Sequence, residues 1–253
     1  MLILNKKVGE TPLQLIERIR LENSELKNQK MSYAGRLDPM AEGQTLILIG
    51  EEENKNRQKY MNFDKEYVAT FLIGFYTDTG DILGLIKKDS IQKKFFSIQT
   101  EEDLRQNFLD LKEKIKKNEE NFLKITEQKY PWFSGKTVSG IKLFDHFKMG
   151  NFDIERPSQK IKINSFELLK LEINKTDDIY EYIKNSINSV SGDFRQAEIL
   201  ENWNWFFKNI SNQIFTFEIK TQVTSGTFIR GLTENFDFPT TLLKLNRTKI
   251  FIK

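Results

Sequence analysis

Four segments with strand-forming composition constrain the fold of this chain more than any other feature. The clearest is EYVATFLIGFY (66–76), which is rich in aromatic and β-branched residues and is followed by a Thr/Asp/Gly turn. Three further segments share this character: TLILIG (45–50), KINSFELLKLEI (162–173) and IFTFEIKTQV (214–223). In the last of these, alternate residues from Phe215 to Thr221 share one face, as expected for a strand that buries one side.

Helical patterns lie between these strands. Thr11, Pro12 and Gln14 have the spacing of an N-cap, an N1 proline and a capping-box partner, which predicts a helix to about residue 22. Other helices are expected after Thr100 with its capping partner Asp103, from Asp177 through Ile187, and near 195–209. EEENKNRQKYMNF (51–63) is interpreted as a loop or a polar helix, and LKEKIKKNEENFLK (111–124) as a solvated helix face. Because strands and helices interleave without a βαβα period, the sequence predicts an α+β fold.

The composition excludes several kinds of site. The 253 residues include no cysteine and a single histidine, His146, so disulfides, iron–sulfur clusters and thiolate zinc sites are excluded. The net charge of +3 is compatible with a polyanionic partner without indicating one. The first residues contain only a four-residue apolar run, and no 18-residue apolar segment occurs, so we expect no signal peptide, no membrane span and a cytoplasmic location.

Two segments carry candidate site residues. In YAGRLDPMAEG (33–43), Asp38 and Pro39 are typical of an N-cap and N1 position of one helical turn that a glycine closes. Such a turn can also present a carboxylate rigidly into a cleft, so a structural and a catalytic role are compatible. In TSGTFIRG (224–231), the glycines indicate a turn, and Arg230 is either a surface charge or the partner of a buried carboxylate.

Two other features have simpler interpretations. TDTGD (77–81) offers carboxylates but lacks the spacing of a calcium loop, which favours a polar turn after a strand. His146 lies among aromatic residues, and one such histidine is more often a packed or surface residue than a ligand.

Five blocks of the sequence, taken in order, carry more information than any one of them. They are NKKVGETPLQLIERI, SYAGRLDPMAEGQTLILIG, KEYVATFLIGFYTDTGDILG, QKYPWFSGKTVSGIKLFDHFKMG and VTSGTFIRGL. In order and spacing, over nearly the whole chain, they resemble the TruB family, the bacterial enzymes that make pseudouridine in the T-arm of tRNA. The resemblance implies the pseudouridine synthase fold, a curved mixed β-sheet flanked by helices with a central RNA-binding cleft. It also implies one catalytic domain, residues 1–253, without a C-terminal PUA-like domain.

The resemblance implies roles for individual residues. Asp38 matches the catalytic aspartate, Tyr67 the tyrosine that stacks on the target base and helps proton transfer, and Arg230 the arginine that pairs with the aspartate. It also implies residues that shape the site or contact RNA: Tyr33, Gly35, Arg36, Leu37, Pro39, Lys65, Lys136 and Lys142. Lys136 and Lys142 are the candidates for phosphate contacts.

The implied reaction converts a uridine of tRNA, position 55 in the T-arm, to pseudouridine. It exchanges the N1–C1′ bond for a C5–C1′ bond without net redox change, so no cofactor and no metal are expected. The implied partner is tRNA, bound by a monomer without a protein partner. Tyr33 stands where the family usually has histidine, and this favours one alternative, a non-catalytic RNA-binding or RNA-folding factor on the same fold. A second alternative is a hydrolase that uses Asp78 and Asp81.

Overall fold

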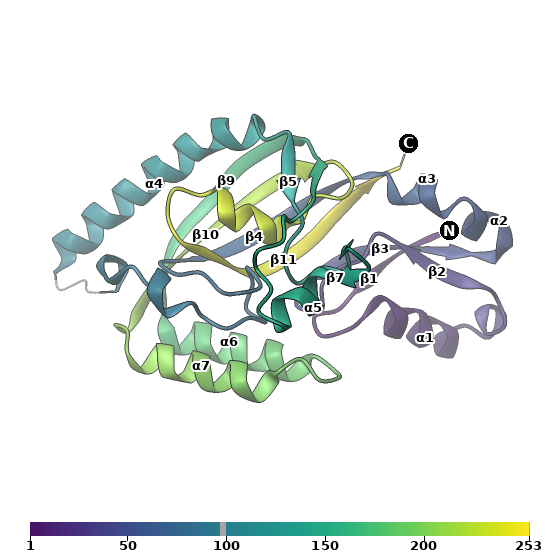
Figure 1. The fold of residues 1–253 in the computed structure, drawn as a ribbon, viewed down its shortest axis with the longest axis horizontal. Helices are drawn as coiled ribbons and strands as arrows, with labels where there is room; N and C mark the ends of the chain where they lie inside the picture. Colours follow the sequence, from purple (N-terminus) through teal and green to yellow (C-terminus); the bar gives the residue numbers. More distant parts are fainter. Residues whose placement is uncertain (97–99, 253) are drawn as a thin grey trace.

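The structure is a computed structural model that describes residues 1–96 and 100–252. Within these residues the chain forms a seven-stranded mixed sheet in the order β1-β3-β11-β4-β10-β9, and β2 also pairs with β3 (Figure 1). Its strands are β1 (Leu2–Lys6), β2 (Met31–Ala34), β3 (Glu42–Ile49), β4 (Asp64–Ile73), β9 (Ile163–Lys175), β10 (Gln213–Val223) and β11 (Thr240–Phe251). Neighbouring strands are antiparallel except for a short parallel contact between β3 and β11. The predicted α+β class is confirmed.

Helices surround this sheet. The α-helices are α1 (Pro12–Glu22), α2 (Gly50–Lys55), α3 (Arg57–Met61), α4 (Glu101–Leu123), α5 (Leu143–Lys148), α6 (Thr176–Ser189) and α7 (Gln196–Lys208). The 3₁₀ helices are η1 (Ser24–Leu26), η2 (Lys88–Ser90), η3 (Lys93–Phe95) and η4 (Ile229–Asn235). Helices α6 and α7 lie together, whereas α4 crosses β9 and extends to one end of the molecule (Figure 1). In the part of the chain that the structure describes, no helix has both the length and the apolar character needed to cross a membrane.

Local signals account for the predicted helices. Thr11 and Gln14 form the expected capping box at α1, and Thr100 and Asp103 form another at α4. Ile183 in α6 is fully buried, as its spacing with its neighbours Ile179 and Ile187 predicts. The lysine-rich part of α4 is not only a solvated face, because Ile115 and Phe122 on it are fully buried; that interpretation was incomplete.

The aromatic core fastens α7 to the turn after β4. Trp203 of α7 is fully buried and packs edge-on against Phe75, with ring centroids 5.5 Å apart. Its indole Nε1 donates a hydrogen bond to the carbonyl oxygen of Ile82, at 3.2 Å. The turn of residues 77–84 is thereby attached to α7, and its bridge from Asp81 to Leu242 attaches it to β11.

A fork in the sheet places the loop that contains Asp38. One edge of β3 first pairs with β11, at Glu42 and Gly43, and then with β2, from Leu46 onward. β2 ends at Ala34, opposite Leu46. The loop of residues 35–41 therefore begins where the two strands part, next to the middle of the sheet.

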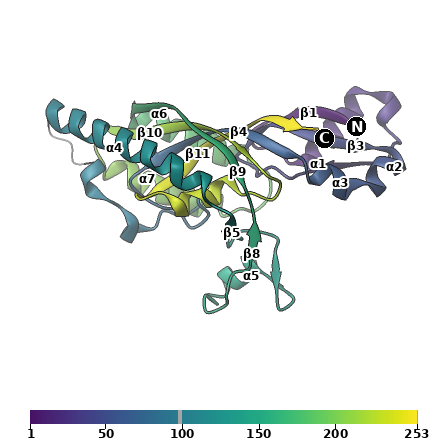
Figure 2. The same cartoon turned by 90° about the horizontal axis from the view of Figure 1, so that it is seen from above.

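A small lobe projects from the body (Figure 2). It contains the paired strands β5 (Glu127–Lys129) and β8 (Ser158–Lys160), the hairpin of β6 (Thr137–Val138) and β7 (Ile141–Lys142), and α5. Rings of Trp132, Phe147 and Phe152 pack on one another there. His146 is buried, with Nε2 3.2 Å from the Val138 carbonyl oxygen, so of the two expected roles, packed or surface residue, it has the packed one.

Two expectations need correction, and a third is decided between its alternatives. The strand predicted at 66–76 ends at Ile73, because Gly74 has a φ of 110° and the chain turns there. Of the two alternatives for residues 51–63, the polar helix is confirmed, because α2 and α3 cover most of this segment. The segment after Asp38 is a turn closed by a bond from Ala41 N to Asp38 O, not a helical turn, because Glu42 already pairs in β3.

Candidate active site

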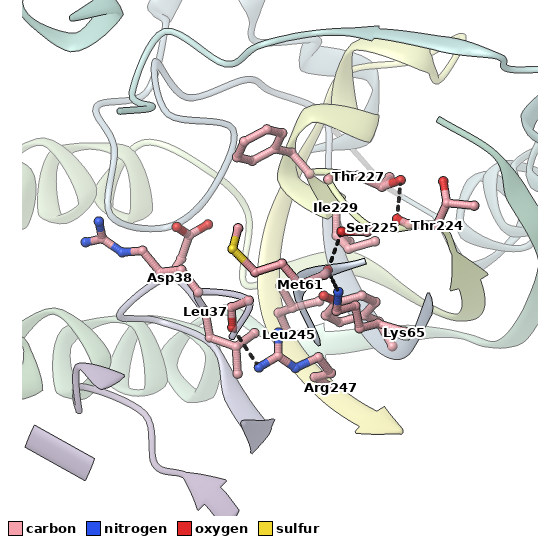
Figure 3. Close-up of a pocket in the computed structure, with 15 residues that line it drawn as sticks. Leu37, Asp38, Met61, Lys65, Thr224, Ser225, Thr227, Ile229, Leu245 and Arg247 are labelled. Atoms are coloured by element: carbon pink, nitrogen blue, oxygen red, sulfur yellow. Dashed lines mark hydrogen bonds between the residues drawn. The ribbon is translucent and has the colours of Figure 1, made fainter. Parts of the chain in front are cut away.

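A cavity of about 260 Å³ lies on one face of the sheet, beside the fork. Its floor comes from β4 and β11, where Tyr67 and Arg247 are cross-strand partners. Lys65 and Leu245, each two residues earlier on the same strands, point to the same face. Figure 3 shows the two walls, with Asp38 and its loop on one side and the turn that begins at 224 on the other.

Asp38 is held at this cavity by Arg230. Arg230 lies in η4 and is only 5% exposed, and its Nε donates to Asp38 Oδ2 at 2.9 Å. Its Nη1 donates to the carbonyl oxygen of Thr79 at 3.0 Å, and its Nη2 to that of Phe133 at 2.7 Å. The guanidinium is thus fixed at three points, whereas the Asp38 side chain keeps 34% of its surface exposed. The predicted pairing of these two residues is present, and Arg230 is not a surface charge.

A second carboxylate, Asp81, faces the same guanidinium. Its Oδ2 lies 4.0 Å from Arg230 Nε, and its Oδ1 accepts from Thr79 Oγ1 at 2.7 Å and from Leu83 N at 3.0 Å. Burial raises the pKa of Asp81 to about 6, and the positive charge of Arg230 opposes this rise. Asp81 therefore adds a buried negative charge behind Arg230 that is present at neutral pH and weakens in mild acid.

The TDTGD segment is a turn, as predicted, and it supports Arg230. Gly80 has a φ of 79°, and a Cβ there would lie 2.7 Å from the carbonyl oxygen of Arg230. Asp78 pairs with Arg195 at 3.1 Å and accepts from Leu85 N at 2.8 Å. The carboxylates of Asp78 and Asp81 are thus held by the turn and do not line the cavity, so the geometry does not favour the hydrolase alternative.

Basic side chains lie at the base of the cavity. Lys65 Nζ donates to the carbonyl oxygen of Met61 at 2.8 Å, and burial, followed by the charge of Arg247, lowers the pKa of Lys65 to about 8. Tyr67 is 7% exposed and lines the same space. The cavity thus combines an aromatic ring, a carboxylate and cations, the groups suited to a nucleotide.

The other predicted residues divide into two groups. Gly35, Arg36 and Leu37 line the cavity together with Asp38. Pro39 does not line it, but its carbonyl oxygen accepts from Gly9 N at 2.8 Å and holds the loop from behind.

Three residues predicted to contact RNA lie outside the cavity. Tyr33 lies on β2, partly buried against the cluster that α1 covers, with the Arg57 guanidinium 5.5 Å from its ring. Lys136 and Lys142 lie in the lobe, where Lys136 Nζ is 5.0 Å from the Tyr130 ring. Their contacts with RNA stay predictions.

Comparison with known proteins identifies the family. The model of the TruB family pseudouridylate synthase N-terminal domain matches residues 23–184. The chain belongs to the TruB family. Among curated relatives, this TruB-family chain is 32% identical over 173 residues to tRNA pseudouridine synthase B of Endomicrobium trichonymphae, covering 68% of this chain and 66% of the relative. It is 30% identical over 175 residues to the protein of that name from Fusobacterium nucleatum subsp. nucleatum, covering 69% and 53%.

The matched segment therefore spans between about half and two thirds of these relatives. A solved structure, "Crystal Structure of a Cbf5-Nop10-Gar1 Complex", aligns with 98% of this TruB-family chain and 48% of its own chain, with a TM-score of 0.48 and 16% identity. Among residues 1–96 and 100–252, no group of three or more histidine, aspartate or glutamate side chains is placed to hold a metal ion.

Sequence reasoning missed several groups that build the site. Asp81 was considered only as a metal ligand or as a catalytic residue of a hydrolase, although the segment that contains it, KEYVATFLIGFYTDTGDILG, resembles the family. The carbonyl oxygens of Thr79 and Phe133 leave no signal in the sequence, because any residue supplies one. Lys6 and Arg247 are buried behind the Asp38 loop, and neither was singled out.

Proposed function

We propose that this TruB-family chain isomerises a uridine of tRNA to pseudouridine, with Asp38 as the essential carboxylate. The observation that carries the proposal is the Asp38 carboxylate, bonded to a buried Arg230 at the edge of a cavity floored by Tyr67. The family assignment supports the same chemistry. The substrate we propose is uridine 55 in the T-arm.

Each group has a task in this proposal. Arg230 holds Asp38 through Oδ2, and the other carboxylate oxygen acts on the ribose as a nucleophile or as a base. The N1–C1′ bond then breaks, the uracil turns, and a C5–C1′ bond forms; C5 releases its proton to solvent and N1 takes up a proton, so the product is an isomer of the substrate. Tyr67 holds the detached base by stacking, an interaction that contributes about 1–3 kcal/mol per base. The uridine must first leave its stack in the RNA loop to reach the cavity.

The partner in this proposal is a tRNA T-arm, bound by a monomer in the cytoplasm. Arg36, which is exposed and lines the cavity, and the exposed Lys136 and Lys142 on the lobe are the residues that we propose contact the flanking phosphates. No feature of the described residues commits this surface to a protein partner.

Release of tritium from tRNA labelled at C5 of uridine tests the reaction. We expect turnover by the unmodified chain and a loss of at least about 1,000-fold for Asp38→Asn, because the amide is a poor nucleophile and a poor base. Asp89→Asn, an exposed aspartate in η2, is the matched control and should keep full activity.

Two results would go against the proposal. Equal turnover by Asp38→Asn would remove Asp38 from the reaction. Tight tRNA binding by the unmodified chain, without tritium release and without carbodiimide-dependent primer-extension stops, would favour the non-catalytic RNA-binding alternative.

A further inference from the structure

The fork in the sheet leaves part of β3 without a strand partner on one edge. β11 pairs with Glu42 and Gly43, and β2 pairs from Leu46 onward. Gln44 and Thr45 lie between these two contacts, and the described pairings give them β1 alone, on the opposite edge. A buried main-chain carbonyl without a donor is unfavourable by about 1–3 kcal/mol, so such a gap must be filled.

The side chain of Arg247 fills the gap. Arg247 is 1% exposed; its Nε donates to the carbonyl oxygen of Gln44, and its Nη2 donates to Thr45 Oγ1 at 3.3 Å. The same Nη2 donates to the carbonyl oxygen of Gly35 at 3.2 Å (Figure 3). One guanidinium therefore joins β3 to the first residue of the loop that contains Asp38.

The backbone of β11 directs this side chain. Arg247 is the cross-strand partner of Tyr67, and the register then shifts so that Lys249 is opposite Glu66. This irregularity begins only after Arg247, so Arg247 keeps the regular alternation with Leu245 and points to the same face of the sheet. Arg247 thus stays on the face of the sheet that forms the cavity floor.

Space filling alone does not explain an arginine at this position. The printed hydrogen-bond acceptors of the Arg247 guanidinium are neutral oxygens, and the buried Lys6 and Lys65 are nearby positive charges. An unpaired buried charge is unfavourable by several kcal/mol. A methionine would occupy a similar length without that penalty, but it would leave the carbonyl oxygens of Gln44 and Gly35 without their donor.

We propose that Arg247 is a positioning residue that sets the place of the Asp38 carboxylate by holding the first residue of its loop. Gly35 has a φ of 81° and no side chain, so its own conformational preference is weak and the bond from Arg247 determines its position. The far end of the loop is held separately, at Pro39, by Gly9 N. The catalytic part of this inference rests on the proposed function.

Arg247→Met is the main test, with kcat and KM measured by tritium release from a labelled T-arm RNA. A displacement of about 1 Å at a reacting group reduces rate about 100-fold, so we expect kcat to fall by about 30- to 100-fold. We expect KM to stay within about threefold, because the other wall and Tyr67 still hold the nucleotide. Arg247→Lys keeps the positive charge but has no guanidinium with several N–H donors in one plane, so its kcat should fall at least about 10-fold.

Two control variants lie on the same strand. Lys249→Met removes an exposed positive charge, and Leu243→Ala removes buried packing without touching the Arg247 guanidinium or its hydrogen bonds. Both should keep kcat within about threefold at a temperature where thermal unfolding shows each protein to be folded. Leu243→Ala therefore separates general destabilisation from loss of the loop contact. If Arg247→Met does not fold, Arg247→Lys serves in its place.

A second measurement does not depend on activity. The Ala41 amide bonds to the Asp38 carbonyl oxygen inside the loop, and hydrogen exchange reports how often that bond opens. We expect exchange at Ala41 to be at least about 10-fold faster in Arg247→Met than in Leu243→Ala.

The outcomes separate this inference from the proposed function. Activity in the unmodified chain with unchanged kcat and unchanged Ala41 exchange in Arg247→Met would overturn the inference alone. A rise in KM with unchanged kcat would also overturn it, because Arg247 would then contact RNA instead of positioning Asp38. If the unmodified chain releases no tritium, the proposed function fails, and Ala41 exchange still decides whether Arg247 holds the loop.

Discussion

Substitution of Asp81 by asparagine tests the electrostatics behind Arg230. The pKa of this carboxyl rises from 3.8 to about 6 because it is buried, and Arg230 only partly offsets the effect. Between these two values the folded chain binds more protons than the unfolded chain, so the contribution of Asp81 to stability is full below pH 3.8 and is lost as pH rises through 6. The whole shift corresponds to about 3 kcal/mol, at about 1.4 kcal/mol per pKa unit.

The assay is urea unfolding of the unmodified chain and Asp81→Asn at about pH 4.5 and pH 7. Part of the loss of stability from Asp81 occurs below pH 4.5. The part that falls between pH 4.5 and pH 7 is therefore about 2 kcal/mol. The measured quantity is the free energy of unfolding of Asp81→Asn minus that of the unmodified chain. We expect this difference to be about 2 kcal/mol larger at pH 7 than at pH 4.5. If this difference is the same at both pH values, the assignment of a raised pKa to Asp81 is refuted. A change of opposite sign would mean that attraction to Arg230 outweighs burial.

Three other predictions concern the supports of the site. Gly80→Ala forces a side chain into a positive-φ position against a main-chain oxygen, so we expect a loss of about 1–3 kcal/mol in urea unfolding and a lower kcat; equal stability would contradict this. Arg230→Lys cannot reach three acceptors, so kcat should fall at least about 100-fold while circular dichroism stays unchanged; a kcat within about threefold would refute it. In the double variant Lys136→Gln, Lys142→Gln, the slope of log affinity for the T-arm against log salt concentration should fall by the amount that about one to two phosphate contacts contribute. An unchanged slope would mean that RNA binds elsewhere.

Local patterns in the sequence were sufficient for part of the fold. The helices that begin near Thr11, Thr100 and Asp177 were predicted because caps and helical spacing are properties of neighbouring residues. β11 was not predicted, although it lies in the middle of the sheet. Its buried polar residues, among them Thr240 and Arg247, hide the alternation that marks a strand, and its pairing depends on residues far away in the sequence.

Only the site residues that lie in recognisable sequence motifs could be predicted. Asp38, Tyr67 and Arg230 were placed at one site by resemblance, and the structure brings them together. The helical turn expected after Asp38 is absent because pairing of β3 with β11 overrides the local preference of the sequence. The buried groups behind the loop act through main-chain oxygens, and only three-dimensional coordinates reveal such contacts.

Mapping of pseudouridines in cellular tRNA tests the central claim most directly. Primer extension after carbodiimide treatment would compare cells with the unmodified gene, cells without it, and cells that express Asp38→Asn at equal protein level. We expect one T-arm uridine to lose its modification both without the gene and with Asp38→Asn, and to regain it with the unmodified chain. Full modification in the Asp38→Asn cells, or no change when the gene is deleted, would contradict the account.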